Sequence, residues 1–505
     1  MSDSTADAGG RVRLAEPRRS RTSHHVDFNT ILAVVNVVVA IVTLIAYDNV
    51  GPNAYVDGDG VLFAMLLAAQ TQIVLFIERR RRDPFVILVT FTLIIYYSLR
   101  ILSLLLVPFS FVFDRFEYLP TDSSRALLFI LVANVFLFAG LFVRSAPAPE
   151  SELTRGWSAR APGRSIFVVV MAMLVIYTRG VAWSTDELPR ALYFVVMFFA
   201  QSFIFLMSLT YFLVFRRALS WPVRTTLVAL LLVEMVLHTL SGSRSAFVGI
   251  LQNILIVLLA GAGVVRVPRR GLIVGAIASP VVIAVLVGTF VLSTYTRTVA
   301  SAGGSTVSSA LEAVQSAGDR LTPDNIVESG LPIILSRVGF FDYAAEAMAH
   351  RAQYARVVNF SAYARSITDN LLTPGVDIYD QPKISNSLRF VYEDLGQPSK
   401  IVSAAEYQSD QLCLYGELFV LLGWWSLPVF FLVGAMAKRV YGAITDEDPF
   451  MRTIKRVIVI TLFVELLNSF GIDWVIMDTV PFVLSMYMYR YFFPTTVPDA
   501  VMATN

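Results

Sequence analysis

The chain has 505 residues, of which 56% are hydrophobic and only 15% are charged, with a net charge of +2 and a single cysteine, Cys413. Soluble domains contain about 25% charged residues, so this composition excludes an ordinary soluble protein. The near-neutral charge does not indicate a nucleic-acid partner, and one cysteine excludes an intrachain disulfide framework.

The N-terminal residues 1–27 are polar and rich in arginine, and no cleavage site follows the first apolar stretch. We therefore expect a cytoplasmic tail here rather than a secretory signal. Beyond the tail lie twelve apolar segments, most of them long enough to cross a hydrocarbon core of about 30 Å. They are residues 28–47, 58–77, 84–110, 123–143, 165–179, 191–215, 225–240, 246–263, 271–293, 412–436, 454–470 and 475–492.

These segments predict an all-α fold, a polytopic membrane bundle of about twelve helices. Helices one to nine occupy 28–293, helices ten to twelve occupy 412–492, and 493–505 form a second tail. Every second connection is basic, and because Lys and Arg concentrate in short cytoplasmic loops, both termini are predicted to be cytoplasmic. The basic groups are Arg79–Arg82; Arg144, Arg155, Arg160 and Arg164; Arg216, Arg217 and Arg224; Arg266, Arg269 and Arg270; and Lys438, Arg439, Arg452 and Lys455.

The long connection 294–411 is the exception to the short loops, and the alternation places it outside the membrane. Loops longer than about 12–15 residues usually carry function or contain structure of their own. Apolar spacing predicts helices in Ser305–Ala317, Pro332–Ala349 and Ile384–Leu395, which would form a helical cap over the outer end of the bundle.

Charged residues within apolar segments mark functional sites, because a lone buried charge is costly in a membrane. Arg100 lies about 24 Å above the cytoplasmic start of the third segment, so it either snorkels to the outer headgroups or serves a substrate. Glu234 and His238 share one face of the seventh segment, as an internal hydrogen-bonded pair or as part of a proton relay.

The connection between segments seven and eight, Ser241–Phe247, contains little besides small polar residues and Arg244. Small residues let the backbone approach a ligand closely, and an arginine offers five donors in a planar fork that suits phosphate oxygens. We interpret this tight external turn as part of an anion site; a turn whose arginine rests on headgroups is the structural alternative.

Two stretches resemble the bacterial O-antigen polymerase and O-antigen ligase superfamily: the turn Ser241–Ala246, and the re-entry segment Glu406–Asp410 followed by Tyr415–Leu418 and Leu422–Trp425. The helix number and the place of the large loop agree with that family as well. The resemblance implies a GT-C-like, metal-independent glycosyltransferase of the bacterial inner membrane whose site faces the periplasm.

Such an enzyme polymerises undecaprenyl-diphosphate-linked oligosaccharide repeat units into O-antigen, capsule or exopolysaccharide. The implied partners are these lipid-linked glycans, the membrane lipid and a chain-length regulator, and no cofactor is expected. Ligases of the superfamily carry a histidine at the end of the large loop, where this chain has Glu406 and Asp410, and the only loop histidine, His350, lies elsewhere. The departure favours the polymerase over the ligase.

Transfer from a diphosphate needs positive charge at the leaving group and a base for the attacking hydroxyl. The candidate bases are Glu406, Asp410 and Asp342, and the predicted catalytic set is Glu406, Asp410 and Arg244. Diphosphate or sugar would be bound by Arg244, Arg337, Arg389, Arg365, Arg100 and Asp342, although a solvated surface role stays open for most loop residues.

A rival metal site would use Asp57 and Asp59 in the first external loop, but that loop is short and a turn before the second helix is the simpler interpretation. A flippase or transporter is the alternative function from another class. It would need a polar path through the membrane centre, where this sequence has few ionisable residues.

Overall fold

The structure is a computed structural model that describes 25–81, 83–106, 118–143, 202–215, 219–240, 244–262, 339–369, 412–446 and 449–468. It also describes a few short pieces, namely 168–170, 172–173, 266–268, 277, 378–379, 384, 388, 391, 483, 486–487 and 490–491. Nearly all of the predicted segments 271–293 and 475–492, most of 165–179, and the first half of 191–215 lie outside the described residues.

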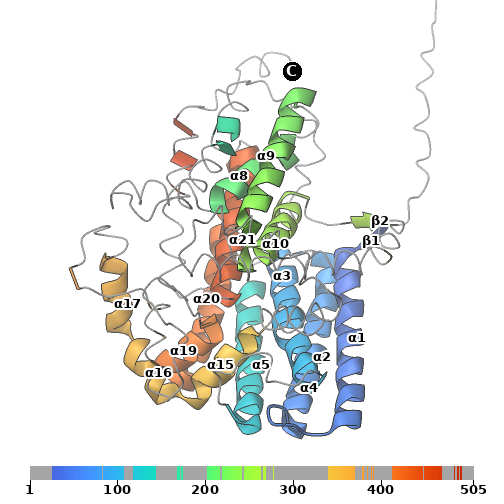
Figure 1. Cartoon of the computed structure of the whole chain (residues 1–505), viewed down its shortest axis with the longest axis vertical. Helices are drawn as coiled ribbons and strands as arrows, with labels where there is room; N and C mark the ends of the chain where they lie inside the picture. The colour runs from blue at the N-terminus through green and yellow to red at the C-terminus, as the bar shows by residue number, and fades with distance from the viewer. Residues whose placement is uncertain are drawn as a thin grey trace, which may run out of the picture.

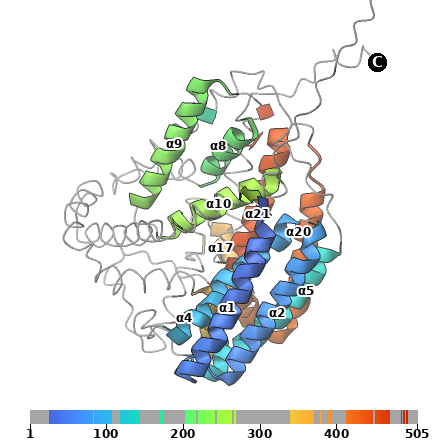
Figure 2. The ribbon, with the colours of Figure 1, turned by 90° about the vertical axis from the view of Figure 1, so that its right-hand side faces the viewer.

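The fold is helical, and in the described residues five helical stretches are long and apolar enough to cross a membrane. Three of them are single helices, α1 (Phe28–Val50), α2 (Gly58–Arg81) and α5 (Pro120–Phe142). Figure 2 shows α1, α2, α5 and α20 side by side. Much of α1 exposes Val, Ile and Leu side chains, as expected of a helix that faces lipid. The chain is therefore built as a multi-pass membrane protein.

The other two candidate spans are interrupted helices. Pro84–Leu106 consists of α3 (Pro84–Leu93), one π-helical turn (η1, Ile94–Ser98) and α4 (Leu99–Leu106). Leu414–Gly442 consists of α19 (Leu414–Leu422), a short 3-10 turn (η5, Gly423–Ser426) and α20 (Leu427–Gly442). Gly423 has φ +60°, a conformation that side chains disfavour, so α19 stops there and the chain changes direction.

A second group of helices packs beside the first, as Figure 1 shows. It contains α8 (Ser202–Phe215), α9 (Trp221–Leu240), α10 (Arg244–Ala262) and α21 (Pro449–Asn468). The α10 and α8 helices both contact α21, and α21 contacts α3 and α20 of the first group.

The closest packing joins α5 to α20 at two glycines. A Cβ added to Gly140 would lie 2.1 Å from the carbonyl oxygen of Phe431, and one added to Gly434 would lie 2.5 Å from that of Leu137. No side chain fits in this space, so the two backbones pack directly against each other, as small residues permit in membrane helix pairs.

A short strand pair was not predicted. Strand β1 (His25–Asp27) pairs antiparallel with β2 (Arg266–Pro268), with Val26 opposite Val267. The pairing brings the start of α1 to the chain that follows α10, so the predicted cytoplasmic tail and one predicted cytoplasmic loop lie together.

The predicted external loop contains three described helices, α15 (Phe340–Ala349), α16 (Arg351–Val357) and α17 (Phe360–Ile367). The α15 helix contacts α5 and α19, and Figure 1 shows it at the end of the bundle where α4 ends, away from β1 and β2. The C-terminal part of the predicted helix Pro332–Ala349 is confirmed. Residues 305–317 and nearly all of 384–395 lie outside the described residues, and α16 and α17 were not predicted.

Candidate functional site

Arg100 lies two residues after the end of the π-helical turn. In that turn the amide of Leu99 donates to the carbonyl oxygen of Ile94, five residues earlier, which widens the helix and changes the direction of the residues that follow. Turns of this kind are frequent at functional sites in α-helices. The side chain of Arg100 is completely buried. Of the two alternatives for Arg100, snorkelling to the headgroups does not fit this burial, because its charge is matched inside the protein.

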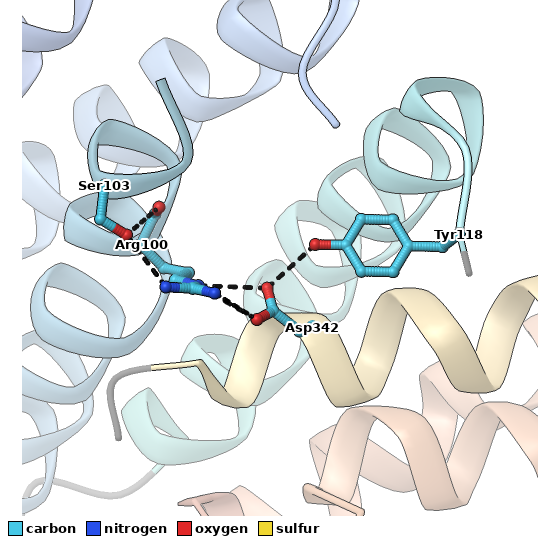
Figure 3. Close-up of polar contacts among 4 residues, drawn as sticks. All are labelled: Arg100, Ser103, Tyr118 and Asp342. Atoms are coloured by element: carbon cyan, nitrogen blue, oxygen red, sulfur yellow. Dashed lines mark hydrogen bonds and ion pairs between the residues drawn. The ribbon is translucent and has the colours of Figure 1, made fainter. Parts of the chain in front are cut away.

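Asp342, in the first turn of α15, matches that charge. Nη2 of Arg100 donates to one oxygen of Asp342 at 2.6 Å, and Nε lies 3.1 and 3.2 Å from the two oxygens. The second oxygen also accepts a hydrogen bond of 3.0 Å from the hydroxyl of Tyr118, and Nη1 of Arg100 donates to Ser103 at 3.2 Å. Figure 3 shows the four side chains converging from α4, from the start of α5 and from α15.

Aromatic rings enclose this cluster. Tyr96 packs edge-on against Phe340 with ring centres 4.6 Å apart, and Tyr118 packs against Phe341 at 6.5 Å. Tyr55, from the first connection, lies edge-on to Tyr118 at 5.7 Å. The first turn of α15 is thus held by rings from three parts of the bundle, which keep water away from the ion pair.

A second layer of contacts lies next to the cluster. Tyr97 packs against Tyr415 of α19, whose hydroxyl donates to Asn134 of α5 at 2.6 Å. Cys413 is buried beside Phe340. The loop helix α15, the re-entry helix α19 and the bundle helices α4 and α5 are therefore locked together at one place.

The geometry decides what this cluster can do chemically. Both oxygens of Asp342 are engaged by Arg100 and Tyr118, so the carboxylate cannot serve as a base without first breaking these contacts. Burial, reinforced by the negative charge of Asp342, raises the pKa of Tyr118 well above its ordinary value, so its hydroxyl stays a donor. The arrangement holds α15 on the bundle; it is not an exposed base beside a free cation.

The other predicted site residues fall into two groups. Arg365 is exposed on α17, and its guanidinium carbon lies 5.9 Å from the ring centre of Tyr379. It belongs to a different helix from Arg100 and from Asp342. Arg244 is the first residue of α10, and three residues separate it from the end of α9, so the connection is as short as predicted. The structure does not describe the side chains of Arg244, Glu234 and His238. It also does not describe the residues Glu406, Asp410, Arg337 and Arg389.

Asp57 is the N-cap of α2. Its carboxylate accepts from the amide of Gly60 at 2.7 Å and from the hydroxyl of Ser124, while Asp59 is exposed. The simpler interpretation of this loop as a turn before the second helix is thus confirmed. Across the described part of the chain, no group of three or more His, Cys, Asp or Glu residues has the arrangement of a metal site.

Two partners of the pair were not predicted. Tyr118 carries no local signal, because an aromatic residue before a helix is common at a membrane boundary. Ser103 could have been found, since it lies three residues after Arg100 on the same helical face.

Comparison of the chain with family models, with characterised proteins and with solved structures gives no match.

Proposed function

We propose that this protein is a membrane glycosyltransferase that polymerises undecaprenyl-diphosphate-linked oligosaccharide repeat units into O-antigen, capsule or exopolysaccharide. A hydroxyl at the free end of one repeat unit attacks the anomeric carbon of the sugar on another carrier. A glycosidic bond forms, the sugar–phosphate bond breaks, undecaprenyl diphosphate leaves, and the hydroxyl proton passes to a carboxylate.

The observation that carries the proposal is the attachment of the large loop to the bundle through Asp342 and Arg100. An enzyme that joins two lipid-linked chains outside the membrane needs a covered region at the outer end of its helices, to position both substrates and to limit water. The α15–α17 segment lies at the end of the bundle that the charge pattern makes external. In this proposal Arg100 and Asp342 are positioning residues, whereas Arg244, Glu406 and Asp410 remain the proposed catalytic residues.

The distribution of buried charge favours an enzyme over a flippase. In the described part of the chain, the buried charged residues lie near the two ends of the helices. One end has Glu78 and Lys438. The other end, at or beside the loop helices, has Arg100, Asp342, Glu346, Asp369 and Glu417. Residues 83 and 100, which lie toward opposite ends of the span Pro84–Leu106, are about 25 Å apart at 1.5 Å per residue. A path for charged sugars would instead need polar groups at the membrane centre.

The membrane topology belongs to the same proposal: about twelve spans in the bacterial inner membrane, both termini in the cytoplasm, and the loop 294–411 in the periplasm. The strand pair β1–β2 supports it, because it joins two segments that the charge pattern assigns to the same side.

Purified protein incubated with defined lipid-linked repeat units tests the reaction. We expect a ladder of products on undecaprenyl diphosphate, unchanged by a chelator, and loss of the ladder in Arg244→Ala. Cells with that variant should keep the protein in the membrane and accumulate carrier with one repeat unit.

Normal chain length in Arg244→Ala cells would exclude the proposed role of Arg244. Movement of lipid-linked sugar across liposomes without elongation would establish the flippase instead. Polymer that stays on undecaprenyl diphosphate and is missing from lipid A in a deletion strain would establish the ligase.

A further inference from the structure

Two exposed arginines from distant parts of the chain lie against one aromatic ring. The guanidinium carbons of Arg125 on α5 and of Arg351 on α16 are each 5.8 Å from the ring centre of Phe419 on α19. Both cations are therefore gathered around the end of α19. Two arginines at one place on the surface create a positive potential that attracts an anion.

Arg351 is fixed in place by the break between α19 and α20. Its Nε donates to the carbonyl oxygens of Phe419 and Val420 at 3.1 and 3.2 Å, in the last turn of α19. Gly423 leaves room for the guanidinium, whose atoms lie 3.4–3.5 Å from where a Cβ would be. Within the described residues, the two terminal nitrogens of Arg351 and the whole guanidinium of Arg125 have no hydrogen-bond or ion-pair partner. Both exposed guanidinium groups thus have donors available for an anion.

Two consecutive tryptophans lie at the same break. Trp424 is 40% exposed and packs edge-on against Phe129 at 5.3 Å, while Trp425 is 85% exposed. A tryptophan so exposed on a membrane protein belongs at the boundary between hydrocarbon and headgroups. Trp425 is about 20 Å from Lys438 at 1.5 Å per residue, so the two residues are separated by about two thirds of a hydrocarbon core of about 30 Å.

Below Trp425 an apolar stripe runs along one face of α20. Leu432 is 57% exposed, Met436 65% and Val440 48%, with the three- to four-residue spacing of a single helix face. From Trp425 to Met436 the stripe is about 16 Å long, which is comparable with the length of the acyl chains in one leaflet. The surface therefore offers cations at headgroup level, aromatic rings at the boundary and an apolar track beneath them.

We propose that Arg125, Arg351 and Trp424–Trp425 form a binding site for the phosphate of an anionic phospholipid of the outer leaflet, whose acyl chains lie along the α20 stripe. The guanidinium forks bind the phosphate oxygens, and the indoles mark the depth of the headgroup. The site is independent of the proposed glycosyl transfer, because it lies on the lipid-facing surface and its occupant is not consumed.

The test uses delipidated full-length protein in detergent, titrated with phosphatidylglycerol and followed by native mass spectrometry. Arg125→Gln is the decisive variant: among the described residues the exposed guanidinium of Arg125 contacts the ring of Phe419 alone, so we expect the fold to stay intact. We expect about a tenfold weaker retention of the lipid in Arg125→Gln and a further loss in Arg125→Gln/Arg351→Gln. Arg356→Gln, another exposed arginine of α16, is the matched control and should bind as the wild type does.

Equal binding of phosphatidylglycerol by the wild type and by Arg125→Gln would overturn the site. Equal binding of phosphatidylcholine would overturn its selectivity for an anionic lipid. Displacement of the lipid by millimolar inorganic phosphate would show a free-anion site instead. None of these readouts depends on sugar polymerisation. A negative result for the lipid site can therefore be distinguished from a negative result for the proposed glycosyltransferase activity.

Discussion

A buried arginine is stable only when its charge is matched, and the pair Arg100–Asp342 has no exposed side chain at all. Removing one member leaves the other as an uncompensated buried charge, which costs about 3–5 kcal/mol. Replacing both by apolar residues of similar volume is often neutral or stabilising. The pair therefore allows stability and function to be separated experimentally.

We predict that Asp342→Ala lowers the free energy of unfolding by about 3–5 kcal/mol in detergent, whereas Arg100→Met/Asp342→Leu recovers most of this loss. Thermal unfolding monitored by size-exclusion chromatography measures both. If the pair also positions the loop for catalysis, the double variant folds but forms a shorter product ladder. A double variant as unstable as Asp342→Ala would contradict the pairing.

Tyr118 gives a pH-dependent prediction at the same place. Its pKa is raised by burial and by Asp342, so the folded chain keeps this proton when the unfolded chain begins to lose it, at about pH 10. The stabilisation by the protonated hydroxyl is present below that pH and is lost as pH rises further.

Tyr118→Phe should cost about 1–3 kcal/mol at neutral pH, the value of a hydrogen bond to a charged group. Above pH 10 the difference from the wild type should shrink by up to about 1.4 kcal/mol per pH unit. Denaturant unfolding at pH 8 and pH 11 measures the change, and the other buried tyrosines cancel because both proteins contain them. A difference that grows with pH would contradict this assignment.

At the scale of elements, the contact between α5 and α20 depends on Gly140 and Gly434. An added methyl group at either position would overlap a backbone oxygen of the other helix, so the helices must separate along their length. Separation would also loosen α19, since α19 and α20 are joined through the short η5 turn.

We predict that Gly434→Ala destabilises the protein by about 1–3 kcal/mol, the usual cost of overpacking. Gly442→Ala, on the same helix, is the control, because a Cβ there meets nothing within 4 Å. Melting temperatures of the two variants, measured side by side, test the prediction. Equal melting temperatures would show that the two backbones are not in contact.

For the whole molecule, the strand pair and the loop helices mark opposite ends of the bundle. Cys413 is completely buried, so cysteines placed elsewhere can be labelled selectively. Asp59 at the start of α2 and Ala443 after α20 are both exposed, one at each end.

In a Cys413→Ser background, we expect an impermeant maleimide to label Asp59→Cys in intact spheroplasts and to label Ala443→Cys only after permeabilisation. Cysteines at Val26 and Val267, which are partners in the strand register, should form a disulfide on mild oxidation. Labelling of both ends from the same side would refute the topology, whatever the enzymatic activity.

Local sequence patterns were sufficient for the elements of the bundle and for some of their ends. Apolar length predicted the helices of the five candidate spans, and the Asp57 turn followed from a short polar loop before a helix. The helices α16 and α17 were missed because seven or eight residues are too few to show a helical period. The breaks at Ile94–Ser98 and Gly423 were missed because apolar composition continues through them.

The sequence alone determined that this is a helical membrane protein and that Arg100 and Asp342 are unusual, because hydropathy and charge are properties of single positions. It assigned both residues to substrate and did not predict that they bind each other. They are 242 positions apart, and the low dielectric inside a helix bundle requires that each buried charge have a partner without specifying which one. Only the tertiary packing of α15 against α4 and α5 selected that partner, and with it the place where the loop is attached.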